Sequence, residues 1–231
     1  MVKQNNKIKF IITNNELRSK NPLFYKGKNR KLFFFSKTIV DKFLAGIGLC
    51  ILSPWLIIVA FILKITEPGS PVFFKQVRIG KNSEKFEIYK FRTMHVGAEG
   101  KLDQLIQHNE IEGAMFKMKD DPRITRFGKV LRNTSIDEFP QLFNVLKGDM
   151  ALVGPRPPLP REVEMYSNYD MQRLAIVPGC TGLWQISGRN ELSFKEMVDL
   201  DLEYINTMSL WLDFNIVFKT IFMLMRSRNG Y

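Results

Sequence analysis

The chain has 231 residues, which is enough for one sizeable domain or for a domain with an appendage. Its hydrophobic fraction of 45% and charged fraction of 25% are ordinary for a globular protein and exclude a chain that is disordered throughout. The net charge of +11 is unevenly distributed, because residues 1–42 hold eleven Lys or Arg against two acidic residues and leave only +2 for the remainder.

Residues 1–36 therefore form a predicted basic arm. Such a cationic segment is attracted to nucleic acid or to an anionic membrane surface, where each basic residue contributes about 1 kcal/mol. A merely solvated tail is a third interpretation. The apolar segment that follows favours the membrane, and we expect no nucleic-acid partner.

Residues 43–63 carry no charge and lie between Lys42 and Lys64. About 20 residues at about 1.5 Å each cross a hydrocarbon core of about 30 Å, so this length is typical of a membrane helix. Ser53-Pro54 lies in its middle, where proline removes a backbone hydrogen bond and kinks a helix. Basic residues flank both ends, which places both ends on the cytoplasmic side. The physics leaves two alternatives open, a re-entrant helix broken at Pro54 and a kinked single span.

Two predicted strands follow, at 72–79 and 86–94, and a turn at 80–83 joins them into a hairpin. Lys90 and Arg92 are two residues apart in the second strand, so they share one face of it. Two cations on one strand face are a candidate phosphate clamp, although a solvated strand face has the same pattern.

Residues 97–118 have the apolar spacing of a helix that leads to a loop at 120–122, and 126–132 is a short basic helix. Pro140 is tolerated only in the first turn of a helix, which places the next helix start near Asp137 and Glu138. Carboxylates in a first turn are routine caps, so a purely structural role for them stays open.

The neighbours of Asp137 and Glu138 favour a different role. Arg132 lies one turn upstream, and Arg156 is fixed between two prolines downstream. Carboxylates bind Mg²⁺ and arginines bind phosphate oxygens, so this combination suits a site for a metal and a phosphate.

The C-terminal third contains a turn-rich segment and two helices. Residues 178–190 are rich in glycine and carry Gln185 and Arg189, which are candidates for contact with a nucleotide. Residues 194–208 form a predicted acidic helix that includes Asp201. Residues 210–225 are aromatic and apolar with polar interruptions, which is typical of an amphipathic helix at a membrane interface, with ordinary core burial as the alternative. The single cysteines Cys50 and Cys180 form no paired motif, which suits a reducing cytoplasm.

Six segments in this order resemble the bacterial sugar transferase family, the monotopic phosphoglycosyl transferases. They are PVFFKQVRIG at 71–80, YKFRTM at 89–94, DPRIT at 121–125, SIDEFPQL at 135–142, GDMALVGPRP at 148–157 and PGCTGLWQ at 178–185. The resemblance covers about residues 37–231. It is to a minimal form of the family that lacks an N-terminal transmembrane bundle, and the chain end is close to the usual family ending.

The resemblance implies transfer of a sugar-1-phosphate from a UDP-sugar to undecaprenyl phosphate with release of UMP, the first membrane step of capsule, O-antigen or exopolysaccharide synthesis. It implies that Asp137 is a nucleophile that forms a phosphosugar–aspartyl intermediate, and that Glu138 with Asp137 holds Mg²⁺. The implied phosphate or substrate contacts are Lys90, Arg92, Arg132, Arg156, Asp201, Gln185 and Arg189. It also implies that Ser53 and Pro54 break the re-entrant helix, and that the donor is a hexose such as glucose or galactose.

The predicted fold is α+β, with a mainly helical catalytic domain, a small β-hairpin, a re-entrant membrane helix and interfacial amphipathic helices. Its parts are a basic arm (1–36), a membrane helix (37–66) and a catalytic domain (67–231) on the cytoplasmic face of the bacterial plasma membrane. A non-catalytic membrane scaffold of the same fold and a one-step transferase with Asp137 as a base remain alternatives. The sequence leaves the oligomeric state open, with a homodimer as one option.

Overall fold

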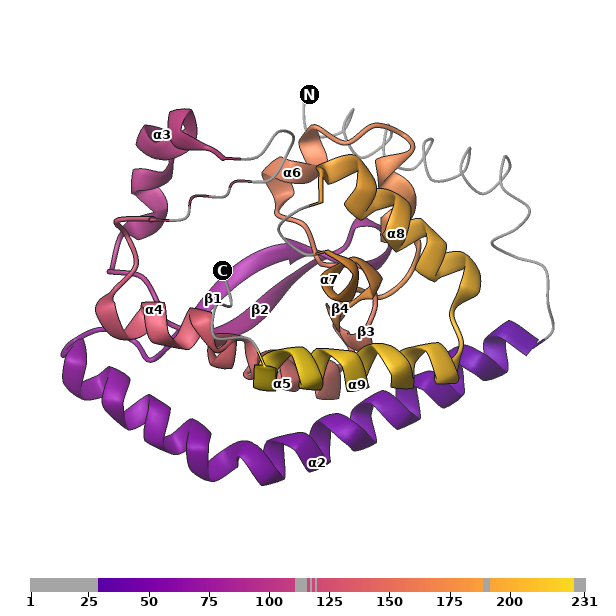
Figure 1. Ribbon diagram of the computed structural model, residues 1–231, viewed down its shortest axis with the longest axis horizontal. Helices are drawn as coiled ribbons and strands as arrows, with labels where there is room; N and C mark the ends of the chain where they lie inside the picture. Colours follow the sequence, from indigo (N-terminus) through magenta and orange to yellow (C-terminus); the bar gives the residue numbers. More distant parts are fainter. Residues whose placement is uncertain (1–28, 111–115, 117, 119, 189–191, 227–231) are drawn as a thin grey trace.

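The computed structural model describes residues 29–110, 116, 118, 120–188 and 192–226. A β-hairpin and short helices lie above a layer of longer helices (Figure 1). The helices are α2 (Asn29–Thr66), α3 (Leu102–Leu105), α4 (Arg126–Asn133), α5 (Gln141–Lys147), α6 (Pro160–Glu164), α7 (Leu183–Ser187), α8 (Phe194–Thr207) and α9 (Leu210–Arg226). The strands are β1 (Phe73–Ile79), β2 (Lys85–Phe91), β3 (Ala151–Val153) and β4 (Gly179–Thr181). The prediction of a mainly helical α+β fold with a small hairpin is confirmed.

Helix α2 is 38 residues long, so residues 29–36, which the sequence analysis assigned to the basic arm, are helical. The helix bends in its middle part (Figure 1), and Pro54 is the proline inside it. Because Pro54 has no N–H, the carbonyl of Cys50 loses its helical donor. Ser53 Oγ donates to that carbonyl at 2.9 Å, which keeps the helix continuous through the bend. By length and composition, Arg30–Thr66 is the one helix in the described part of the chain that is able to cross a membrane.

The predicted hairpin is confirmed. β1 and β2 pair antiparallel with Phe74 opposite Lys90 and Arg78 opposite Phe86. A 3₁₀ turn at Lys81–Ser83 joins the strands. Because opposite residues of an antiparallel pair share a face, Arg78 and Lys90 lie on the same side of the hairpin.

The predicted helix at 97–118 is wrong in its described part. The chain there forms a 3₁₀ turn at Ala98–Lys101, the single turn α3 and a second 3₁₀ turn at Ile106–His108. Ile106 is 52% exposed, so its side chain has little surface to pack against. Helical spacing of apolar residues does not stabilise a helix without such packing, because short helices depend on tertiary contacts. Residues 111–115, 117 and 119 of this segment lie outside the described residues.

The segment 178–190, predicted as a Gly-rich loop, contains β4 and α7 in its described part. β4 pairs parallel with β3, with Ala151 opposite Gly179 and Val153 opposite Thr181. A Cβ at Gly179 would lie 2.1 Å from Gly154 N, so only glycine allows the two segments to approach this closely. Val153 belongs to the main apolar cluster, which α8 and α9 complete with Val198, Leu202, Tyr204, Ile205 and Ile216.

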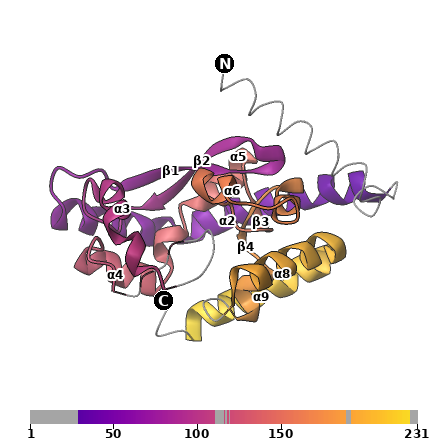
Figure 2. The ribbon, with the colours of Figure 1, turned by 90° about the horizontal axis from the view of Figure 1, so that it is seen from above.

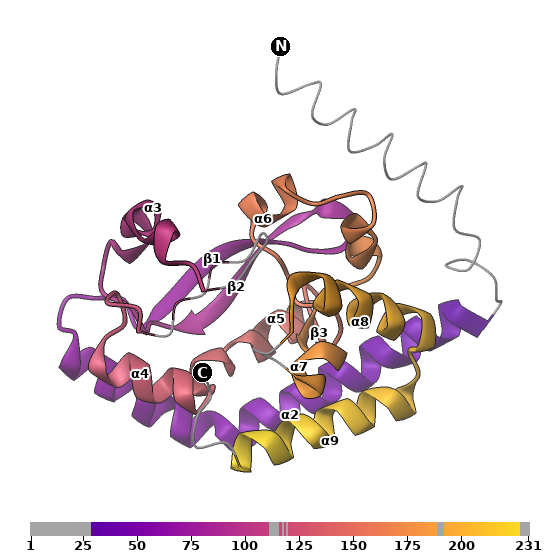
Figure 3. The same cartoon turned by 45° about the horizontal axis from the view of Figure 1, so that its top comes forward.

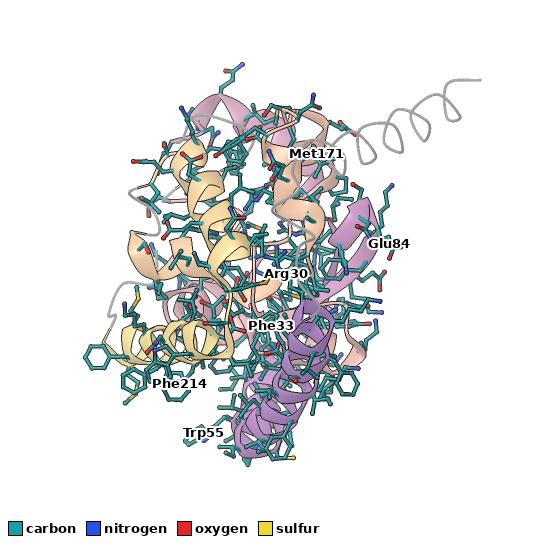
Figure 4. All side chains as sticks on the ribbon, turned by 90° about the vertical axis from the view of Figure 1, so that its right-hand side faces the viewer. Arg30, Phe33, Trp55, Glu84, Met171 and Phe214 are labelled. Atoms are coloured by element: carbon teal, nitrogen blue, oxygen red, sulfur yellow. The ribbon has the colours of Figure 1, made fainter. Side chains whose placement is uncertain are left out.

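The helices predicted at 194–208 and 210–225 are present as α8 and α9, and the placement of α9 at a membrane interface stays a prediction. Helix α9 runs beside α2 (Figures 1–3), and Lys37 Nζ of α2 lies 2.7 Å from Asp213 Oδ2 of α9. The outer surfaces of both helices are apolar. Trp55 of α2 and Phe214 of α9 project from the lower side of the molecule in Figure 4, and they are 68% and 60% exposed. These two helices therefore present an exposed apolar surface on one side of the protein.

Candidate active site

Asp137 and Glu138 lie in a 3₁₀ turn, Ile136–Glu138, between α4 and α5. Ser135 before it has a φ of 56°, so the chain reverses direction there and starts the new turn. Pro140 is the N-cap of α5, which places the two carboxylates just before this helix rather than inside it. Adjacent residues of a helical turn point in different directions. Accordingly, Asp137 is 6% exposed, whereas the Glu138 side chain is 41% exposed.

Lys90 joins the hairpin to this turn. Its Nζ donates a hydrogen bond to Glu138 Oε1 at 2.5 Å. The Lys90 side chain is 19% exposed, so the contact is partly shielded from water. A shielded ion pair of this length is a charge-assisted hydrogen bond, which is stronger than one between neutral groups. The sequence analysis gave Lys90 as a phosphate or substrate contact; the structure places it against Glu138, and its contact with a substrate stays a prediction.

The two neighbouring carboxyls have pKa values shifted in opposite directions. Burial raises the pKa of Asp137 to about 6, against the opposing charges of Lys90 and Arg132. Burial also acts on Glu138, but the charge and hydrogen bond of Lys90 outweigh it and lower the pKa of this carboxyl. Near neutral pH both groups are ionised, and Asp137 is the more easily protonated of the two. Such separated values are typical of catalytic pairs.

Two predicted arginines lie close enough to act on these carboxyls. Arg132 of α4 lowers the pKa of Asp137 by its charge, and Arg156 lowers that of Glu138. Arg132 Nε donates to Thr93 Oγ1 at 2.9 Å, which orients its guanidinium. Helix α4 approaches Thr93 so closely that a Cβ at Gly128 would lie 2.1 Å from Thr93 O. The structure thus brings Lys90, Arg132 and Arg156 around the carboxylates from a strand, a helix and a loop.

Arg78 is a fourth cation of this group, and the sequence analysis missed it. It is only 6% exposed, and its charge also lowers the pKa of Glu138. In the sequence, Arg78 is one of several residues of a predicted strand whose side chains point alternately to its two faces. The signal that could have identified it is the hairpin register, since a turn at 81–83 places residues 78 and 90 on one face.

Arg92 and Gln185 are two further predicted contacts that the structure describes. Arg92 follows β2, where its Nε donates to Pro71 O at 2.9 Å and its guanidinium lies over the Phe74 ring at 5.8 Å. Gln185 lies in α7, and its Oε1 is 2.7 Å from where a Cβ of Gly182 would be. Arg189 lies outside the described residues. A contact of Arg92, Gln185 or Arg189 with a substrate stays a prediction.

Asp201 lies in the interior of the domain. It is completely buried in α8, and Arg173 Nη2 donates to its Oδ2. Arg173 is 3% exposed and also donates to Tyr166 Oη at 2.9 Å. Burial raises the pKa of Asp201 to about 6 in spite of the opposing charges of Arg173 and Arg156. Asp201 thus pairs with a buried arginine and is close enough to Arg156 for its charge to act, and substrate contact by Asp201 stays a prediction.

The pair Asp137–Glu138 fits a Mg²⁺ site of the kind that substrate phosphates complete. Among the described residues there is no group of three or more His, Cys, Asp or Glu side chains able to hold a metal ion. A site made of protein ligands alone is therefore not built into the described part of the chain. Mg²⁺ commonly binds through one or two carboxylates together with phosphate oxygens and waters. Asp137 and Glu138 are the carboxylates of this site, and a Mg²⁺ ion bound by them stays a prediction.

The fold and the site together define a protein with an apolar, membrane-compatible helix and a carboxylate–arginine site suited to phosphate-bearing ligands. The chain belongs to the bacterial sugar transferase family, whose sequence pattern matches residues 32–227. This range includes α2 from residue 32 on, the hairpin, the Asp137–Glu138 turn and α9.

Several characterised proteins are similar to the chain. It is 47% identical over 196 residues to the galactosyl transferase CpsE of Streptococcus agalactiae, with 83% of this chain and 43% of CpsE covered. It is 39% identical over 209 residues to the exopolysaccharide production protein ExoY of Rhizobium meliloti, with 89% and 92% covered. It is 39% identical over 207 residues to the UDP-glucose:undecaprenyl-phosphate glucose-1-phosphate transferase of Xanthomonas campestris, with 86% and 40% covered. The chain thus spans less than half the length of the first and third relatives and nearly all of ExoY.

Proposed function

We propose that the chain transfers a sugar-1-phosphate from a UDP-sugar to undecaprenyl phosphate and releases UMP. The observation that carries the proposal is the buried Asp137 carboxylate beside Glu138, with Lys90 bonded to Glu138 and the charges of Arg132 and Arg156 acting on the pair. The names of the Xanthomonas relative and of the Salmonella typhimurium undecaprenyl-phosphate galactose phosphotransferase, which is 41% identical over 201 residues, support the same reaction class.

The proposed chemistry has two displacements at one phosphorus. In the first, an Asp137 carboxylate oxygen bonds to the phosphorus that carries the sugar, and the bond from this phosphorus to the oxygen of UMP breaks. In the second, a phosphate oxygen of the lipid bonds to the same phosphorus, and its bond to Asp137 breaks. A covalent intermediate lets a soluble donor and a lipid acceptor use one site in turn. The pKa of about 6 keeps Asp137 ionised near neutral pH, as a nucleophile requires.

The cations of the site offset the negative charge that gathers there when the donor binds. A diphosphate and two carboxylates repel one another, and this repulsion must be offset before the nucleophile reaches phosphorus. Lys90 neutralises Glu138 at 2.5 Å, and Arg132 and Arg156 offer guanidinium groups that match phosphate oxygens. Glu138 and Asp137 would hold Mg²⁺, which when bound supplies positive charge to the phosphate oxygens.

The membrane part of the proposal concerns α2 and α9. We propose that α2 enters the cytoplasmic leaflet, turns at the bend near Pro54 and leaves on the same side. We also propose that α9 lies in the membrane interface beside it. The exposed aromatic residues Trp55, Trp211, Phe214, Phe218 and Phe222 support this placement. The arrangement would hold the reaction site near the lipid headgroups, where a polyprenyl phosphate presents its phosphate. A kinked span is the alternative topology.

The donor is proposed to be a UDP-hexose. The names of the relatives include galactosyl, glucose-1-phosphate and N-acetylgalactosamine transferases, so the donor is a matter for experiment. The test is a screen of UDP-glucose, UDP-galactose, UDP-N-acetylgalactosamine and a UDP-diacetamido sugar with undecaprenyl phosphate and Mg²⁺. We expect UMP release with one of the first two donors. No UMP from any donor, with protein that is folded and in detergent, would favour the non-catalytic scaffold.

A further inference from the structure

Arg156 is carried by a loop, residues 154–158, that contains three prolines. Pro155, Pro157 and Pro158 have no N–H, so the loop contributes few donors and is held mainly through its carbonyls. Each proline carbonyl accepts a hydrogen bond from a different group: Gly179 N at 2.9 Å to Pro155, Arg78 Nη1 at 3.0 Å to Pro157, and Ile79 N at 2.9 Å to Pro158. The loop is therefore anchored on both sides of Arg156.

The hydrogen bonds that anchor the loop differ between its β4 side and its β1 side. On the β4 side the anchors belong to backbone, where Gly154 N also donates to Thr181 O at 2.9 Å. On the β1 side one anchor is the Ile79 amide and the other is the Arg78 side chain. Of the three bonds to proline carbonyls, the bond from Arg78 is the one that a point mutation can remove without a change of backbone.

The Arg78 guanidinium is itself fixed in place. Its Nη2 donates to Gln76 Oε1 at 2.7 Å while Nη1 donates to Pro157 O, so the planar fork spans two partners. Gln76 Nε2 in turn donates to Glu99 Oε1 at 3.1 Å. At 6% exposure Arg78 is enclosed by the fold, which leaves it little opportunity to touch a substrate. A lysine keeps the charge but lacks the fork that reaches both partners.

We infer that Arg78 is a positioning residue for Arg156, holding the Pro157 carbonyl so that the Arg156 guanidinium faces the Asp137–Glu138 turn. The inference rests on the proposed function, because it assigns Arg156 a part in binding the transferred phosphate. Side chains near a reacting phosphate act only in a narrow range of positions, and a displacement of about 1 Å costs about 100-fold in rate.

A double-mutant cycle tests the inference, using full-length protein in detergent and initial rates of UMP release. We expect Arg78→Met to lower kcat/KM for the UDP-sugar by about 10- to 100-fold when Arg156 is present. In an Arg156→Met background we expect the same change to lower it by a clearly smaller factor, since the group that Arg78 positions is gone and only the loss of the Arg78 charge near Glu138 remains. Arg78→Lys should fall between wild type and Arg78→Met. Equal losses in both backgrounds, or full activity of Arg78→Met, would overturn the inference.

Hydrogen exchange supplies a readout that does not depend on turnover. In Arg78→Met, or in Arg78→Lys if the methionine variant does not fold, we expect amide exchange to become about tenfold faster at Arg156 and Leu159, which carry N–H groups in the 154–159 segment, and at Ile79, which donates to Pro158 O, with α8 unchanged. Unchanged exchange at these residues would contradict the anchoring role even where activity falls. Wild-type protein that releases no UMP from any donor would refute the proposed function instead, so the two failures are distinguishable. Lys75→Met, on the opposite face of β1, is the matched control and should leave exchange and kcat/KM unchanged.

Discussion

Lys90 Nζ lies 2.5 Å from Glu138 Oε1, and this contact joins β2 to the turn before α5 across 48 positions of sequence. The same ammonium opposes the rise in the pKa of Asp137 that burial causes. Lys90 therefore links the hairpin to the Asp137–Glu138 turn electrostatically, because its positive charge acts to lower the pKa of both carboxyls.

Removal of this cation should impair the reaction. We expect Lys90→Met to lower kcat/KM by about 100-fold or more, because Glu138 loses its counter-ion and the site loses a charge that offsets the diphosphate. Steady-state UMP release measures the effect. Lys75→Met is the control, since the Lys75 side chain lies on the other face of the hairpin, is 56% exposed, and contacts Glu87 at 3.5 Å and the Tyr89 ring at 5.4 Å. Equal losses for the two variants would show that hairpin charge in general, rather than the contact with Glu138, matters.

Asp137→Asn should be more stable than the wild type above pH 6. The Asp137 pKa is raised from 3.8 to about 6 in the folded state, so its ionised form destabilises the fold. The penalty is absent below pH 3.8, grows between pH 3.8 and 6, and is constant above pH 6. An asparagine has no such penalty, and we expect a gain of about 1–3 kcal/mol at pH 8 without Mg²⁺. Thermal unfolding in detergent between pH 4 and 8 measures it. A Tm difference that does not shrink toward pH 4 would refute this cause.

The buried pair Arg173–Asp201 should behave as a structural unit. Replacing one member leaves the other charge buried and unpaired, so Arg173→Met or Asp201→Leu alone should lose about 3–5 kcal/mol of stability. The double variant Arg173→Met/Asp201→Leu should recover much of that loss, because both charges are gone. Chemical unfolding of the four proteins gives the coupling. Single variants of normal stability and abolished activity would instead assign Asp201 to the substrate.

A re-entrant α2 would have both of its ends on one side of the membrane, which cysteine labelling can test. With Cys50 and Cys180 replaced by serine, single cysteines at Lys31→Cys and Ser70→Cys should react with an impermeant maleimide from the same, cytoplasmic side. Lys31 lies 12 residues before the uncharged stretch 43–63, and Ser70 lies 7 residues after it. Labelling from opposite sides of sealed vesicles would establish a kinked span and exclude the re-entrant helix.

Local chemistry allowed much of this fold to be predicted. The turn at 81–83 defined the hairpin, Gly148 with a φ of 92° ends α5 as expected, and the amphipathic spacing of 210–225 marks α9. Pro54 was expected to kink the membrane helix, and α2 bends in its middle part (Figure 1) while the Ser53 hydroxyl bonds to the freed Cys50 carbonyl. Each of these features depends on residues close in sequence.

The features that the sequence left hidden depend on distant contacts. The helix expected at 97–118 has the right spacing, but its exposed Ile106 shows that little packs against it. The β3–β4 pair needs Gly154 and Gly179 to meet, which no local pattern reveals. Arg78 joins the site only through the hairpin register, and Asp201 is buried only because Arg173 faces it. Positions of charged groups relative to one another were therefore the least predictable part of the site.

The central claim is that Asp137 carries the transferred sugar phosphate. The most direct test is incubation of the protein with Mg²⁺ and a UDP-sugar labelled in its sugar-linked phosphate, without acceptor lipid, followed by rapid acid quench and peptide mass analysis. We predict a labelled sugar phosphate on the peptide that contains Asp137 in the wild type, none in Asp137→Asn, and loss of the label when undecaprenyl phosphate is added. Wild-type protein that turns over with the lipid but never carries the label would contradict the claim and favour a one-step transfer with Asp137 as a base.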